Sequence, residues 1–286
     1  MDALEESNWV YFDGGVSGAQ ALTKIDLPQL KTCTHFQLHN LAAITNLDGF
    51  NNLVSVSPGL FVISNADIAG ADVKLKTING FNKLTTVAAG LDLSAASGSG
   101  LTGTLTTIQG FQQLTSVHDI ALAGNKLEDI SGFKNLTTIT GIFSLGGTAL
   151  KDLGGLQKLT TVGDQLLIYD NLSLTNMKAL SSLATLNRIY FYHNPELSSL
   201  EGLEKITSIK GGMQLTNNIK LDNLDGLINV AGAISSIYIT GNTALKDLCG
   251  LKKLINGIDN TTIYQVNSNG YDPTQQDFQN GNCMKR

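Results

Sequence analysis

Tyrosine is concentrated in one part of this 286-residue sequence, together with side chains that can hydrogen-bond to a ligand. Four of the seven tyrosines fall between residues 169 and 238, and an arginine and a glutamine lie among them. Exposed tyrosine beside arginine is typical of protein-binding hot spots and of surfaces that stack against sugar rings. The alternative is that tyrosine simply favours exposed strand positions. The predicted ligand-binding patch consists of Tyr169, Arg188, Tyr190, Tyr192, Gln214 and Tyr238.

Two acidic residues offer a different chemistry, the cleavage of a polysaccharide. Asp92 and Asp119 are expected on neighbouring strands, and carbohydrate-cleaving enzymes use pairs of carboxyl groups a few ångströms apart. We expect this pair to be staggered, with no basic or third acidic partner beside it. Since a fold does not specify a reaction, the sequence favours a protein without catalysis, and a polysaccharide-degrading enzyme is the alternative.

Metal and cofactor chemistry has little support in the sequence. His35 and His39 would lie about 13 Å apart along a strand, which is too far to share one metal ion. No glycine-rich phosphate loop, nucleophile elbow or zinc-ligand spacing occurs. We therefore expect no cofactor and no metal, and we expect the two histidines to be exposed on one strand.

A repeat sets the elements that would position these residues. The phrase Ile108-Gln-Gly-Phe-Gln-Gln-Leu-Thr-Ser-Val117 recurs with a period of about 23 residues, for example at 200–209. Short alternating runs such as Ile189-Tyr-Phe191 follow it, and alternation predicts a strand with one buried face. One turn cannot bury that face alone, so the turns must stack. The sequence therefore predicts a mainly β fold, a right-handed β-solenoid of about ten turns with short helical or irregular corners.

Two further columns recur in register with the strands. A side-chain amide at one turn position can bond the backbone of the next coil, which satisfies buried peptide groups where the chain bends. Stacked threonines, as at Thr85, Thr115 and Thr137, are expected to stabilise the sheet. The asparagine column comprises Asn65, Asn125, Asn171, Asn194, Asn218 and Asn242.

The repeat divides the chain into three parts. Residues 25–266 are expected to form a single solenoid, and two early turns carry insertions near 66–73 and 95–103. The end coils of a solenoid expose an open core and a sheet edge that must be covered. We therefore assign residues 1–24, a polar and aromatic segment, to an N-terminal cap, and residues 267–286 to a C-terminal cap.

The three cysteines have different expected roles. Cys33 takes the register of buried Val117, which predicts a buried free thiol. Cys249 lies at a corner of the last turn and Cys283 lies in the tail. A disulfide between them would hold the tail over the open end and would require an oxidising compartment. Whether they pair is left open, because sequence does not give the geometry.

Composition limits the partners. A net charge of −5 without a basic cluster argues against nucleic acid. No apolar run of about 18 residues is present to span a membrane. Charged residues make up only 15% of the chain, which suits an extracellular β-protein. Met1 is followed by Asp2 and soon by Glu5, so an exported protein would need a leader that this chain lacks.

The phrase Leu-x-Gly-Leu-x-x-Leu-Thr-x-Val/Ile, followed by an Ile-x-Leu strand and Asn, resembles the repeat of receptor L domains. These are the ligand-binding lobes of insulin- and EGF-receptor ectodomains. The phrase is also similar to leucine-rich-repeat proteins exported to bacterial cell surfaces, and the resemblance covers roughly residues 25–270. The receptor lobes are shorter and rich in disulfides, whereas this chain has few cysteines, which favours the bacterial branch.

The resemblance implies a leucine-rich-repeat solenoid located outside the cell or on a bacterial cell surface. Membrane contact would come only from a lipid anchor on an upstream cysteine that is absent from this chain, and we expect a monomer. The predicted function is a non-catalytic extracellular binding module that engages a protein or glycan ligand through its outward strand face. A structural or adhesion spacer is the second alternative, beside the polysaccharide-degrading enzyme.

Overall fold

A computed structural model describes residues 5–14, 22–64, 73–95, 103–259 and 261–285. The fold is mainly β, with 33% strand and 8% helix, and its parallel strands stack in a β-solenoid of about 10 turns. This confirms the mainly β solenoid that the repeat predicts. Asn65 and most of the two expected insertions lie outside the described residues.

The chain divides into two compact units, and each is described by itself. The first unit contains residues 1–148 and 154–156, and the second contains residues 149–153 and 157–286. The expected solenoid of residues 25–266 therefore spans both units.

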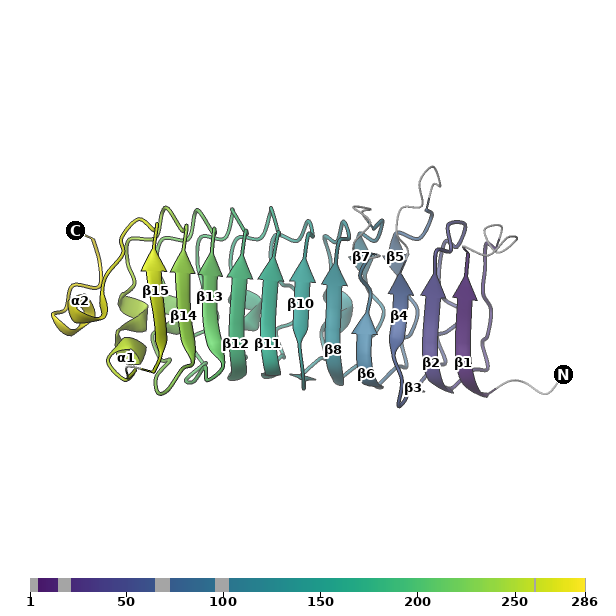
Figure 1. Ribbon diagram of the computed structural model, residues 1–286. Helices are drawn as coiled ribbons and strands as arrows, with labels where there is room; N and C mark the ends of the chain where they lie inside the picture. The colour runs from purple at the N-terminus through teal and green to yellow at the C-terminus, as the bar shows by residue number, and fades with distance from the viewer. Residues whose placement is uncertain (1–4, 15–21, 65–72, 96–102, 260, 286) are drawn as a thin grey trace. The chain divides into compact units, whose positions relative to one another are not determined.

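In the first unit the strands of the main sheet are all parallel (Figure 1). Strands β3 and β4 share one turn, since both pair with β2 and with β6. Residues assigned to the N-terminal cap form strand β1, which pairs in parallel with β2, so the sheet begins before residue 25. The bounds are β1 (Glu6–Asp13), β2 (Thr32–His39), β3 (Ser55–Val56), β4 (Phe61–Ser64), β6 (Thr86–Asp92), β8 (Ser116–Ala123), β9 (Thr138–Ile139) and β10 (Phe143–Gly146), with β5 (Thr77–Ile78) and β7 (Thr107–Ile108) in a separate two-stranded sheet.

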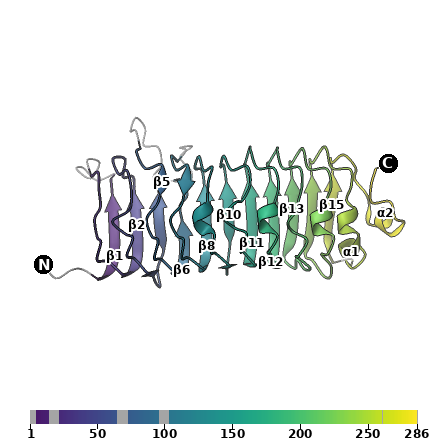
Figure 2. The same cartoon turned by 180° about the vertical axis from the view of Figure 1, so that it is seen from behind.

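Among the described residues of the second unit, five parallel strands follow one another in sequence order, and they lie side by side in Figure 1. Short helices form several corners, as predicted, and Figure 2 shows them on the reverse side of the sheet. The strands are β11 (Thr161–Tyr169), β12 (Thr185–Tyr192), β13 (Gly212–Thr216), β14 (Ser236–Thr240) and β15 (Ile263–Asn267). The helices are the 3₁₀ turns η3 (Lys178–Leu180), η4 (Asp225–Leu227) and η5 (Cys249–Leu251), and the α-helices α1 (Lys252–Ile255) and α2 (Gln275–Gln279), while η2 (Ser131–Phe133) belongs to the first unit.

The core of the first unit contains a stack of phenylalanine rings. The ring of Phe81 lies 5.6 Å from that of Phe50 and 5.3 Å from that of Phe111, measured between centroids. Phe111 in turn stacks on Phe133 at 5.7 Å. All four side chains are fully buried. One ring from each turn therefore contributes to a continuous apolar interior, because each turn buries its face only against its neighbours.

The asparagine column forms a buried hydrogen-bond ladder in the second unit. The Asn194 side-chain oxygen accepts hydrogen bonds from the backbone N–H and the side-chain amide of Asn171, both at 3.1 Å. The Asn194 amide donates to the carbonyl of Ile168 at 3.0 Å. The Asn194 side chain thus bonds the backbone of the preceding coil, where the sequence predicted the next coil, and its amide also donates to Asn218 of the next coil. Asn218 and Asn242 repeat the pattern.

The ladder extends one step further than the sequence indicated. Asn269 accepts from the backbone and side chain of Asn242. The Asp272 carboxylate then accepts from the backbone N–H and the amide of Asn269, at 3.0 and 2.8 Å. Asp272 therefore takes the place of the next asparagine and ends the ladder.

The glycine of the repeat phrase is required by close backbone approach. A Cβ atom at Gly132 would lie 2.0 Å from the carbonyl oxygen of Gly110. A Cβ atom at Gly226 would also lie 2.0 Å from a backbone carbonyl oxygen, that of Leu200. Both distances are far below van der Waals contact, so no larger residue fits without a backbone shift. The corner glycine therefore sets how closely successive turns pack.

The threonine column contributes hydrogen bonds between turns. The Thr137 hydroxyl donates to the Thr115 carbonyl at 3.0 Å, and the Thr85 hydroxyl donates to the Val54 carbonyl at 3.2 Å. These hydroxyls therefore link successive turns by hydrogen bonds, in line with the predicted role in sheet stabilisation.

A C-terminal cap is fastened to the last turns. Cys249 and Cys283, whose pairing the sequence left open, are joined by a disulfide with a Cα–Cα distance of 4.9 Å. The Leu248 N–H donates to the Cys283 carbonyl at 2.9 Å, and Phe278 of α2 is fully buried. Cys33 is a buried free cysteine, as predicted, and burial raises the pKa of its thiol to about 11.

Candidate ligand-binding face

The strands of the second unit alternate between buried and solvent-facing residues. On β12, Ile189 and Phe191 are fully buried, whereas Arg188, Tyr190 and Tyr192 are partly exposed. Alternation of this kind follows from the two-residue period of a strand. The same pattern holds on β11, β13 and β14. All six predicted site residues therefore lie on one outward face.

The parallel register arranges the face in rows that run across the strands. Tyr190 of β12 pairs with Gln214 of β13, which pairs with Tyr238 of β14. Two residues further along the strands, Tyr169 of β11 pairs with Tyr192 of β12. Neighbouring strands are about 4.8 Å apart, so the structure brings the predicted tyrosines together in two adjacent rows.

Tyr169 and Tyr192 form a stacked pair. Their ring centroids are 5.2 Å apart and their planes differ by 18°. Partial burial, then Tyr169 and then Asp170, raise the pKa of Tyr192 above its ordinary value. The phenol group therefore stays protonated and can donate a hydrogen bond. On the far side of Tyr192 the row continues with the small residues Thr216 and Thr240.

Arg188 is held at the start of this face by an ion pair. Its guanidinium nitrogen lies 3.1 Å from a carboxylate oxygen of Asp164, and the Asn187 amide donates to the same carboxylate. A Cβ on Gly211 would lie 2.6 Å from the Arg188 side chain, so the glycine makes room for the arginine stem. Since Asp164 offsets the charge of Arg188, the pair adds little net charge to the face.

Two more polar residues flank the tyrosines. The His193 ring and the Asp170 carboxylate are hydrogen-bonded at 2.5 Å. Both residues have positive φ, 55° and 54°, and each immediately precedes a ladder asparagine. Asp164, Asp170 and His193 were not predicted from the sequence. Asp164 lies at the register irregularity of β11 between Val162 and Gln165, and Asp170 and His193 directly follow the ends of β11 and β12. Their position directly before the asparagine column was the available signal for the last two.

A second aromatic group lies on the outward face of the first unit. The Trp9 side chain is 56% exposed, and its ring stacks on that of His35 with centroids 4.0 Å apart. Tyr11, which is 53% exposed, lies beside His39 at 5.9 Å. Both aromatic residues belong to the segment that the sequence predicted to be a cap. The alternation of Trp9, Val10 and Tyr11 was the signal for a strand, and Val10 is indeed buried.

The predicted histidines and the predicted acidic pair lie on strands of the first unit, the histidines on β2 and the two aspartates on β6 and β8. His35 and His39 are partly exposed on one strand, as expected. Among the described residues, no cluster of three or more metal-ligating side chains is found. In the register of β6 and β8, Asp92 pairs with Ala121 and Asp119 pairs with Gly90, so the carboxylates are staggered.

Both carboxylates are engaged by neighbouring backbone. Asp119 accepts the Ile142 N–H at 2.6 Å, and Asp92 accepts the Ser94 N–H at 2.8 Å. The Asp92 bond is typical of a side chain that stabilises a turn, and the Asp119 bond joins two successive coils.

Over the part of the chain that the structure describes, no helix combines the length and apolar character needed to cross a membrane. The chain matches no known family model and no curated protein. The similarity to receptor L domains and bacterial surface proteins therefore remains a prediction from the repeat phrase.

Proposed function

We propose that this protein is a non-catalytic extracellular binding module that holds a glycan or protein ligand on the outward face of β11 to β14. The observation that carries the proposal is the clustering of Tyr169, Tyr190, Tyr192 and Tyr238 in two adjacent rows. Tyrosine combines a large apolar surface with a polar tip and loses little conformational entropy when it is immobilised.

The backbone beneath the face is rigid, which favours recognition. Strands β12, β13 and β14 are hydrogen-bonded on both sides, and the asparagine ladder fixes the turns at their ends. A ligand therefore meets side chains that are already positioned, and less ordering entropy opposes binding.

A neutral glycan is the first ligand class to test. The rows that contain the tyrosines also contain Gln214, Thr216, Thr240 and Asn267, whose amides and hydroxyls can bond sugar hydroxyls. The charge of Arg188 is offset by Asp164. Exposed tyrosine is equally suited to a protein ligand, so a protein is the second class.

The proposed location is the extracellular space or a bacterial cell surface. A disulfide between Cys249 and Cys283 is typical of proteins that fold in an oxidising compartment. In this proposal the protein is a monomeric leucine-rich-repeat module, and contact with a membrane comes from a lipid anchor.

A glycan array followed by calorimetry on the best hit tests the site. The double variant Tyr190→Ala/Tyr238→Ala should weaken binding by about 30-fold or more, because aromatic hot spots each contribute about 1–2 kcal/mol. Tyr11→Ala is the matched control, an exposed tyrosine on a strand of the first unit, and should leave the affinity unchanged. If no glycan binds, the same variants are tested on protein ligands found by a surface-protein array.

Equal affinities for the wild type and the double variant would refute this site. The absence of catalysis is tested on the same glycans, by following the release of reducing ends. Release that disappears in Asp92→Asn or Asp119→Asn would replace the proposed function with a polysaccharide-degrading activity.

A further inference from the structure

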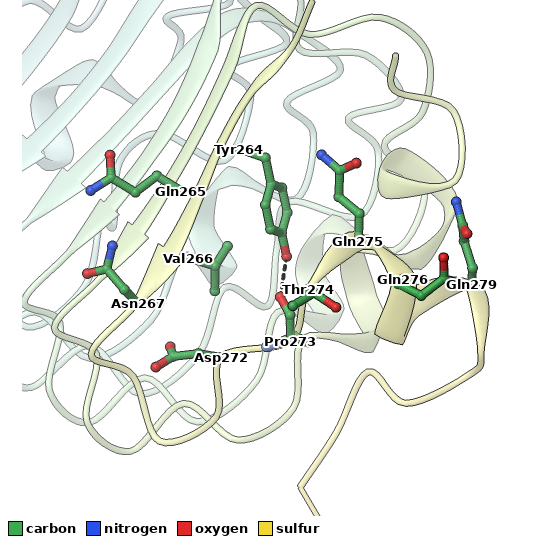
Figure 3. Close-up of a pocket in the computed structure, with 10 residues that line it drawn as sticks. All are labelled: Tyr264, Gln265, Val266, Asn267, Asp272, Pro273, Thr274, Gln275, Gln276 and Gln279. Carbon is green, nitrogen blue, oxygen red and sulfur yellow. Dashed lines mark hydrogen bonds between the residues drawn. The ribbon is translucent and has the colours of Figure 1, made fainter. Parts of the chain in front are cut away.

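We propose that the open edge of β15, together with helix α2, forms a site for one extended segment of a partner polypeptide, which adds to the sheet as a further strand. This site is separate from the tyrosine face and does not depend on the function proposed for it. A cavity of about 620 Å³ lies between the edge of β15 and the segment that carries α2 (Figure 3). Cavities of this size are typical of ligand sites.

The backbone of β15 carries unused hydrogen-bonding capacity on the cavity side. The Ile263 N–H donates to the Ser235 carbonyl, and the Asn267 carbonyl accepts from the Gly241 N–H. Backbone groups alternate between the two sides of a strand. Tyr264 and Val266 therefore direct their N–H and C=O groups away from β14. Within the described residues the sheet ends at β15, so these two residues offer two donors and two acceptors to an added strand.

The inward-facing side chains of β15 are also incompletely covered. Val266 and Tyr264 occupy the register of Ile239 and Ile237 of β14, which are fully buried. On β15 both positions are only partly buried. Figure 3 shows them on the side of the strand that faces α2. An added strand with an apolar side chain beside Val266 would complete the burial that every inner turn achieves.

The C-terminal cap leaves the cavity unfilled, because the contacts that fix the cap lie at the rim of the cavity. The Tyr264 hydroxyl donates to the Pro273 carbonyl at 2.6 Å (Figure 3). The disulfide between Cys249 and Cys283 fastens the tail that follows α2. Thr274 and Asp277 form a capping box at the start of α2. These contacts fix the far wall and leave the edge of β15 free.

The structure favours a short peptide segment over a second copy of the chain stacked end to end. A further coil would continue the asparagine ladder, but Asp272 already occupies the acceptor position beyond Asn269. The α2 segment closes the other side of the cavity. We therefore assign this space to a single extended segment.

The chemistry of the lining selects among peptides. The lining residues include one carboxylate, Asp272, and no cation, and the wall opposite β15 presents the amides of Gln275, Gln276 and Gln279. A segment that is neutral or positively charged is therefore complementary. Added strands of this kind gain affinity from main-chain hydrogen bonds and specificity from alternate side chains.

The test uses a phage-displayed library of random heptapeptides, selected on the full-length chain, and synthetic copies of the selected peptides. Hydrogen exchange followed by NMR should show that a bound peptide slows exchange of the Tyr264 and Val266 amides by about tenfold or more. Exchange of the backbone N–H of Gln265, which faces β14, should change little.

Variants at one residue separate the edge from its side chain. Val266→Pro removes a cavity-facing N–H and should weaken peptide binding by about tenfold or more, because proline at a strand edge keeps the bonds on the other side. Val266→Ala keeps the N–H and should weaken binding only a few-fold. Circular dichroism melts check that each variant is folded. Gln275→Trp is a second blocking variant that fills the cavity from α2 and leaves β15 intact.

Three outcomes would overturn the proposal. The first is that no selected peptide loses affinity for Val266→Pro and for Gln275→Trp. The second is that the peptides protect the tyrosine face and lose affinity for Tyr238→Ala, which places them there. The third is concentration-dependent self-association that Val266→Pro abolishes, which assigns the edge to a second copy of the chain.

Discussion

The two units build their turns from the same repeat phrase but hold the turns together differently. In the second unit an amide ladder runs without a break from Asn171 to Asp272. In the first unit a phenylalanine stack runs from Phe50 to Phe133. Contacts between equivalent residues span 22 to 31 positions in the first unit and 23 to 27 in the second.

The difference shows which interaction tolerates irregular turns. Hydrogen bonds require a narrow range of distance and angle, so the ladder is found where the turn length is nearly constant. Apolar packing has no preferred direction, so stacked phenylalanines accommodate turns of unequal length. The outward faces follow the same division. Trp9 and Tyr11 pair with single histidines in the first unit, whereas in the second unit Tyr169 stacks on Tyr192. In the neighbouring row Tyr190 and Tyr238 lie on either side of Gln214.

The largest effect is expected at the ladder. Asn218→Leu should lower the free energy of unfolding by about 4 kcal/mol, because it removes the acceptor of the buried Asn194 N–H and the hydrogen bond to the Phe191 carbonyl. Urea unfolding measures the change. Asn229→Leu, at an exposed asparagine, is the control and should cost much less. Equal effects for the two variants would contradict a stabilising ladder.

The glycine column should not distinguish the two units. Gly132→Ala and Gly226→Ala should each cost about 3 kcal/mol, since each places a Cβ 2.0 Å from a backbone oxygen of the preceding turn. One turn already carries alanine at this position, Ala179, so Ala179→Gly should cost less than about 1 kcal/mol. If Gly132→Ala left the free energy of unfolding unchanged, a close backbone approach that requires glycine would be confined to the second unit.

Removal of the disulfide should destabilise the second unit. The variant Cys249→Ala/Cys283→Ala should lose about 2–4 kcal/mol of stability and should speed hydrogen exchange in β15 and α2. The fluorescence of Trp9, the single tryptophan, reports on the first unit. A Trp9 transition at unchanged denaturant concentration would show that the units unfold separately, and a matching shift would show that they unfold together.

The smallest effect concerns Cys33 of the first unit and depends on pH. Burial raises the pKa of its thiol from 9.0 to about 11, so between these values the folded state binds more protons than the unfolded state. Linkage then makes the Cys33 contribution to stability fall as pH rises from about 9 to about 11. Cys33→Val should flatten the decline in this window, measured by urea unfolding at several pH values. Parallel curves for the two proteins would show that the thiol does not contribute.

The pairing of strands and the outward positions of the tyrosines could be predicted from sequence. A two-residue alternation specifies which face of a strand is buried, and this placed Tyr190 and Tyr238 on the outward face. The repeat phrase supplied the register, because equivalent residues of stacked turns lie side by side. The Asn194 ladder was also predictable, since a buried amide at a fixed turn position must find backbone partners.

Other features depend on contacts between segments whose spacing does not repeat. The membership of Trp9 and Tyr11 in the sheet required the pairing of β1 with β2. The end of the ladder at Asp272, the disulfide of Cys249 and the cavity beside β15 all arise where the last turn meets the tail. The sequence by itself determined the regular part of the protein, because a periodic pattern has one way to stack. Only the tertiary structure decided how the ends are closed, because the tail meets the last turn through contacts that occur once.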